Sequence, residues 1–88
     1  MLPRPNPAVI CKSLNEGAVL FSEGDETYYG LNAVGFRVWQ ALPPQCRTLE
    51  ELCASVGQAF TGAEPDVIRV DVVELLDELA RSGLVLPP

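Results

Sequence analysis

The chain has 88 residues, with 12 acidic side chains, 6 basic side chains, a net charge of −6 and no histidine. This length buries enough surface for one modest core, and too little for a core plus a deep enclosed catalytic cavity. The acidic balance disfavours nucleic acid and anionic membrane as partners, because both attract proteins through Lys and Arg. Without histidine, the commonest general base and metal ligand is missing, so a binding module is the first hypothesis.

The N-terminal segment is not expected to be a signal peptide. Pro3, Pro5 and Pro7 interrupt it where a signal peptide needs an apolar helix, and no stretch of the chain approaches 18 apolar residues. We therefore expect a cytoplasmic protein.

Three short strands are predicted first, over residues 8–14, 18–22 and 27–31, and turn-forming residues separate them. Short links imply an antiparallel meander in which the second strand is central. The N-terminal prolines blunt the edge of the first strand, because proline cannot donate to a ladder. The third strand, around Tyr28, Tyr29 and Gly30, has neither proline nor lysine, so its edge is unprotected.

Helical periodicity begins after Asn32, which is a good N-cap, and stops at the prolines 43 and 44. Thr48 and Glu51 form a capping box for a second helix. Gly62 is the predicted C-terminal stop of that helix.

The third helix is predicted to begin near Pro65 or Asp66 and to end at Gly83. Residues 84–86 then form a last short strand or simply cover the core. The pattern predicts one α+β domain over residues 1–88, winged-helix-like, with a three-stranded antiparallel sheet followed by three helices. The core stripe of the third helix consists of Ile68, Val72, Leu75, Leu76 and Leu79.

Val70 and Val73 fall to one side of this stripe, with Glu74 and Asp77 nearby. Either the valines pack against the sheet or the terminal segment, or a groove with an apolar floor and an acidic rim lies between the third helix and the third strand. Residues 64–82 hold six acids and two bases, which is a net −4 of the total −6. A solvated helix face explains such a run as well, but a DNA-reading helix is disfavoured because phosphates would be repelled.

An enzyme is also disfavoured. Cys11, Cys46 and Cys53 match neither a metal pair nor a disulfide framework, and we expect reduced, mostly buried thiols. A cysteine nucleophile would lack a histidine to form the thiolate pair. No cofactor and no metal site are predicted.

The order and spacing of several short motifs resemble the PqqD-like family, and the likeness extends over roughly residues 8–86. The motifs include a Leu-Asn-x-x-Gly corner between strand and helix that is followed by Trp39. They are Asn15-Glu16-Gly17-Ala18-Val19-Leu20, Tyr29-Gly30-Leu31-Asn32-Ala33-Val34-Gly35, Val38-Trp39, Arg47-Thr48-Leu49-Glu50-Glu51-Leu52, Asp71-Val72, Leu75-Leu76, Leu79 and Gly83-Leu84-Val85. The sequence departs from the family at Val34, where a hydroxyl residue is common, and the cysteines are no family signature.

The resemblance implies a recognition element for ribosomally synthesised and post-translationally modified peptides (RiPPs). Such a domain is non-catalytic and holds the leader of a precursor peptide as an added strand on its third strand, against its third helix. The implied partners are the precursor leader and a modifying enzyme, which is a leader peptidase, a cyclase or a radical SAM enzyme. A stand-alone member of lasso-peptide type is favoured, and a peptide chaperone in pyrroloquinoline quinone biosynthesis or a general protein–protein scaffold module is the alternative.

The expected peptide-binding residues come from both sides of this groove. Leu31 and Tyr29 are two residues apart, so their side chains point to the same face of the strand and both are also candidates for the core. Ordinary sheet packing is the alternative for each tyrosine. Glu74 and Asp77 would favour a leader that carries Lys or Arg. The expected set is Tyr28, Tyr29 and Leu31 from the strand and Val70, Val73, Glu74 and Asp77 from the helix.

Overall fold

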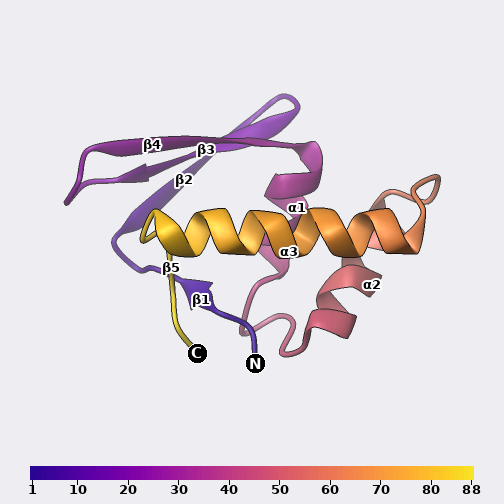
Figure 1. Ribbon diagram of the computed structural model, residues 1–88. Helices are drawn as coiled ribbons and strands as arrows, with labels where there is room; N and C mark the ends of the chain where they lie inside the picture. Colours follow the sequence, from indigo (N-terminus) through magenta and orange to yellow (C-terminus); the bar gives the residue numbers. More distant parts are fainter.

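The computed structural model describes residues 1–88, and a three-stranded antiparallel sheet forms its upper part in Figure 1. The strands are β2 (Val9–Leu14), β3 (Gly17–Ser22) and β4 (Thr27–Asn32), in the spatial order β2-β3-β4. The predicted meander with a central second strand is therefore confirmed. Because β3 alone has two neighbours, β2 and β4 each keep one edge without a partner strand.

Three helices follow the sheet: α1 (Ala33–Ala41), α2 (Leu49–Ala59) and α3 (Pro65–Arg81). The α+β fold class is confirmed, and so are both predicted N-terminal caps. The side chain of Asn32 accepts a hydrogen bond from the Gly35 N–H at 2.8 Å. Thr48 and Glu51 form the reciprocal capping box of α2.

The predicted end of α2 at Gly62 is wrong. The helix ends at Ala59 and is capped by Phe60, whose φ of −128° already departs from helical values. The Phe60 ring packs against the core, so tertiary contact stops the helix before the chain reaches the glycine.

The end of α3 is as predicted. Gly83 has a φ of +71°, in the left-handed region that favours glycine. Its N–H donates to the Ala80 carbonyl at 3.2 Å, and the Leu84 N–H donates to the Leu79 carbonyl at 2.9 Å. This pair of bonds is a Schellman motif, and the fully buried Leu79 and Leu84 side chains supply its hydrophobic contact.

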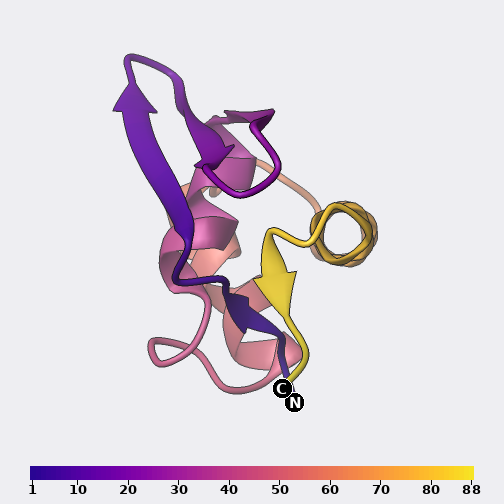
Figure 2. The same cartoon turned by 90° about the vertical axis from the view of Figure 1, so that its left-hand side faces the viewer.

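A second, two-stranded ribbon joins the two ends of the chain. It pairs β1 (Arg4–Pro5) with β5 (Val85–Leu86), so residues 84–86 do contain a last short strand. The sequence did not predict β1, because its prolines are typical of a segment outside a sheet. Asn6 secures the pairing, since its main-chain N–H donates to the Leu84 carbonyl at 3.1 Å and its amide donates to the Gly83 carbonyl at 3.0 Å. The two termini therefore lie side by side (Figure 2).

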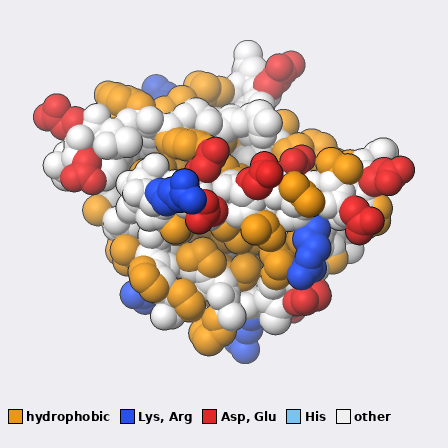
Figure 3. Space-filling model, in the orientation of Figure 1, with side chains coloured by type: hydrophobic (Ala, Val, Ile, Leu, Met, Phe, Trp, Pro, Cys, Tyr) orange, Lys and Arg blue, Asp and Glu red, His pale blue; other side chains and the backbone are white.

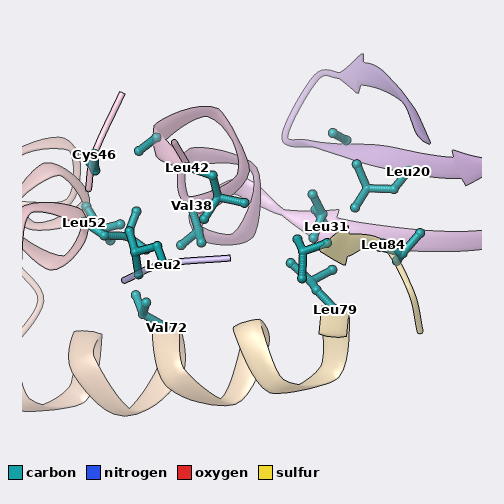
Figure 4. Packing of buried hydrophobic residues seen from close by; sticks show 14 of the residues in the cluster. Leu2, Leu20, Leu31, Val38, Leu42, Cys46, Leu52, Val72, Leu79 and Leu84 are labelled. Atoms are coloured by element: carbon teal, nitrogen blue, oxygen red, sulfur yellow. The ribbon is translucent and has the colours of Figure 1, made fainter. Parts of the chain in front are cut away.

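The core lies between the inner face of the sheet and the helices (Figure 4). Leu20 and Leu31 enter it from the sheet, and Val38 enters it from α1. Helix α3 packs mainly on α2, β5 and α1, and it runs across the front of the molecule below β4 (Figure 1). No helix is both long enough and apolar enough to cross a membrane.

Candidate functional site

A surface groove of about 340 Å³ lies between β4 and α3. One wall is the β4 segment from Tyr29 to Asn32, and α1 supplies the floor through Val34, Gly35 and Val38. The opposite wall belongs to α3, from Asp71 to Glu78. A groove between the third helix and the third strand is therefore present, with acidic side chains on its α3 wall, but its apolar floor comes from α1 and not from Val70 and Val73.

The corner between β4 and α1 shapes one end of the groove. A Cβ atom at Gly35 would lie 3.2 Å from Cδ2 of Leu31 and 3.3 Å from Oδ1 of Asn32. Both distances are tight, so glycine at this position lets the Asn32 cap close and brings α1 up against the strand. The Leu-Asn-x-x-Gly motif thus has a direct physical reason.

The main chain of β4 has a defined free side. The Leu31 carbonyl oxygen points to β3, because it would lie 2.0 Å from a Cβ atom built at Gly17. Main-chain groups of a strand alternate between its two sides, so Tyr29 also bonds toward β3. The two-residue link between Leu14 and Gly17 leads to the same assignment. Such a link closes on a hydrogen-bonded pair, so Gly17 bonds toward β2 and the next residue of β3 bonds toward β4, where its partner is Leu31. The N–H and C=O groups of Tyr28 and Gly30 therefore face the open edge.

Side chains of β4 alternate between the two faces of the sheet. Leu31 is only 7% exposed and belongs to the core, as its parity suggested. Tyr29 is half-buried and lines the groove. Tyr28 points to the opposite face, where it is 71% exposed and its ring stacks on Phe21 with a centroid separation of 4.7 Å. Tyr28 therefore contributes its main chain, and not its ring, to the groove side.

A hydrogen bond links the two walls: the Tyr29 hydroxyl donates to a carboxylate oxygen of Glu78. This bond, with partial burial and the nearby negative charge, raises the pKa of Tyr29 to about 12. The hydrogen bond and the neighbouring carboxylate therefore disfavour ionisation of this phenol.

On α3, the structure brings Glu74 into the groove lining but leaves three other expected residues outside it. Val70 and Val73 are 55% and 47% exposed, so the interpretation that they pack against the sheet or the terminal segment is wrong. Asp77 forms an exposed ion pair with Arg81 at 2.9 Å.

Two carboxylates of the lining, Asp71 and Glu78, were not predicted as site residues. Together with Glu74 they follow the spacing i, i+3, i+7, which places all three on one side of a helix. A helical-wheel comparison with the core stripe would have separated them from Asp77. No basic residue lines the groove, and acidic side chains gather along the side of α3 that faces β4 (Figure 3).

The cysteines lie elsewhere. All three are free, as expected, but only Cys46 is buried, and Cys11 and Cys53 are half-buried. Burial raises the pKa of both the Cys11 and the Cys53 thiols, which favours the neutral form over a reactive thiolate. No group of three or more His, Cys, Asp or Glu side chains has the arrangement to hold a metal ion.

The sequence of the chain matches the family described as Coenzyme PQQ synthesis protein D (PqqD) over residues 17–85, which is well over half of its length. The chain belongs to the PqqD family. The matched segment begins at Gly17 and contains β3, β4 and all three helices, and therefore the whole groove.

A solved structure has the same fold. It is described as TbiB1 in complex with the TbiA(beta) leader peptide, and it superimposes with a TM-score of 0.79 at 28% sequence identity. The match covers 93% of this chain and 93% of TbiB1. No curated protein matches the chain at a significant level.

Proposed function

We propose that this PqqD-family protein is a RiPP recognition element, which captures the leader of a precursor peptide by strand addition to β4. The observation that carries the proposal is the open main-chain edge of Tyr28 and Gly30 beside the groove between β4 and α3. The similarity to TbiB1, a protein solved with a leader peptide, supports it.

The edge and the groove have different roles in this mechanism. An extended peptide satisfies the free N–H and C=O groups of β4, which gives affinity for many sequences. Alternate peptide side chains enter the groove, where Tyr29, Val34 and Leu75 offer apolar contact and Glu74 offers charge. The groove therefore supplies the choice among peptides. Because a disordered leader loses entropy on docking, we expect micromolar to high-nanomolar affinity, about −8 to −10 kcal/mol.

The remaining expected residues fit a leader that extends beyond the groove. Such a peptide would reach Val70, Val73 and Asp77 on the outer side of α3, where the two valines leave apolar surface exposed. The free edge of β2 is the competing place for strand addition. That strand carries Lys12, which protects an edge, and none of its residues lines the groove between β4 and α3.

We further propose that the chain is a single, non-catalytic domain that works in the cytoplasm and presents the bound leader to a modifying enzyme. Lasso-peptide biosynthesis, with a leader peptidase or a cyclase, is the favoured pathway. Pyrroloquinoline quinone biosynthesis, with a radical SAM enzyme, is the alternative, in keeping with the description of the family. Co-purification with the enzymes encoded beside this gene separates the two pathways.

Calorimetric titration of the purified protein tests leader capture. The probes are the precursor peptide encoded beside this gene, its isolated leader and its leaderless core, with the TbiA(beta) leader as a further peptide. We expect the whole precursor and the isolated leader to bind with similar affinity and the core not to bind. Equal binding of the leaderless core would contradict the proposal and favour a general scaffold. An unchanged precursor mass after incubation is expected for a non-catalytic protein.

A further inference from the structure

The Tyr29–Glu78 hydrogen bond joins residues that are 49 positions apart, and it crosses the groove from β4 to α3. Helix α3 takes its main packing contacts from α2, β5 and α1. The Tyr29–Glu78 bond is the one hydrogen bond that links side chains of β4 and α3. We call this bond the clasp.

A peptide bound in the groove comes into contact with the clasp. A peptide strand paired with the free edge at Tyr28 and Gly30 directs every second side chain toward α3. Tyr29 lies between these two residues in β4, and its hydroxyl reaches α3 at Glu78. A peptide side chain that points into this end of the groove thus competes with the phenol for the same carboxylate.

The charge of the groove indicates which side chain wins that competition. Asp71, Glu74 and Glu78 line the groove, and no Lys or Arg lines it. The one ion pair of the molecule, between Asp77 and Arg81, lies outside. In the free protein Glu78 receives a hydrogen bond only from a neutral phenol, whereas an ammonium or guanidinium group donates a hydrogen bond and also neutralises the carboxylate charge in an ion pair.

The spacing of the carboxylates suits an extended chain. Glu74 and Glu78 are four residues apart on α3, which is about 6 Å along the helix axis. Side chains on the same side of a strand repeat every two residues, at about 6.6 Å. A peptide can therefore place an apolar side chain over the floor and keep a basic side chain in reach of the acidic wall.

We propose that the clasp is a specificity determinant of the groove. A Lys or Arg of the captured peptide displaces the Tyr29 hydroxyl from Glu78, and the released Tyr29 ring then packs on the peptide. The proposal rests on leader capture at β4 and names the chemical class of the leader, which is an apolar segment that carries a basic residue facing α3.

Selection from a random twelve-residue peptide library displayed on messenger RNA tests the proposal with the full chain. The baits are the wild-type protein, Glu78→Gln, and the control Glu23→Gln, which removes the same charge from an exposed turn outside the groove lining. We expect Lys and Arg to be enriched by the wild type and by Glu23→Gln, and this enrichment to be lost with Glu78→Gln. For one selected peptide, Lys→Gln in the peptide should weaken wild-type binding about tenfold and Glu78→Gln binding hardly at all.

Tyr29→Phe adds a test of opposite sign, because it keeps the ring and removes the hydroxyl. If the clasp must open, this variant binds the selected Lys peptide three- to tenfold more tightly, whereas a hydroxyl that contacts the peptide predicts weaker binding. The ¹³Cζ resonance of Tyr29 in labelled wild-type protein should also shift when that peptide is added. Urea unfolding of each variant checks that the fold is intact.

The outcomes separate this inference from leader capture itself. If no peptide is enriched by any bait, strand capture at β4 is overturned together with the clasp. If peptides are enriched without basic residues, or if Glu78→Gln keeps the basic preference, the clasp is overturned while strand capture stands. Weaker binding of the Lys peptide by Tyr29→Phe also contradicts displacement of the hydroxyl.

Discussion

Replacing Tyr28 with proline tests the free edge of β4 most directly. The Tyr28 N–H faces the open side of the strand, so proline removes a donor that the folded protein itself does not use. Proline also removes the ring that stacks on Phe21, which is worth about 0.5–1.5 kcal/mol. Tyr28→Ala loses the same ring and keeps the N–H, so the difference between the two variants isolates one main-chain donor.

The expected magnitude follows from the bond that the peptide loses. A lost ladder bond costs about 1 kcal/mol, and a peptide carbonyl left without a partner adds about 1–2 kcal/mol. We therefore expect Tyr28→Pro to bind the precursor leader roughly 30- to 140-fold more weakly than Tyr28→Ala, since each 1.4 kcal/mol is tenfold. Calorimetry measures the binding. Urea unfolding, followed by Trp39 fluorescence, should give the two variants similar free energies of unfolding.

Tyr29→Pro provides the contrast, because its N–H bonds toward β3. This variant should lose about 3 kcal/mol of folding stability, as a donor of the protein's own ladder disappears. If Tyr28→Pro binds as well as Tyr28→Ala, strand addition at this edge is refuted. The same holds if proline at 28 unfolds the protein as severely as proline at 29, because the assigned free side would then be wrong.

Three further predictions concern stability. Gly17→Ala should lower the free energy of unfolding, measured by urea titration, by about 3 kcal/mol, because its Cβ would lie 2.0 Å from the Leu31 carbonyl oxygen. Gly30→Ala is the control: no atom lies within 4 Å of its Cβ, so the free energy of unfolding should change by less than about 1 kcal/mol. Leu79→Ala should cost about 3 kcal/mol by the same measurement, because this side chain is fully buried, and a smaller loss would mean that the site collapses around the gap. The Tyr29 hydroxyl has a pKa of about 12 in the folded protein and about 10 when unfolded, so its stabilisation is complete below pH 10 and is lost as the pH rises through 12. The urea midpoint of the wild type should therefore fall more steeply over this range than that of Tyr29→Phe, and parallel curves would contradict the hydrogen bond to Glu78.

Most of the secondary structure was determined by short-range sequence. Asn32 and Thr48 cap the helices that they precede, and Gly83 ends α3 in the left-handed conformation. Each of these signals acts on main-chain groups within about four residues, so no knowledge of the fold is needed to use it. The open edge of β4 also follows from sequence, because short links leave the third strand of a meander with one neighbour.

The tertiary structure decided the rest. The pairing of residues 4–5 with residues 85–86 joins opposite ends of the chain, and no local sequence pattern predicts a strand at Pro5. The position of α2's end depends on where Phe60 meets the core. The rotation of α3 about its axis decides that Asp71 and Glu78, and not Val70 or Val73, line the groove. Periodicity places residues on a helix face, but only packing against distant elements determines what that face meets.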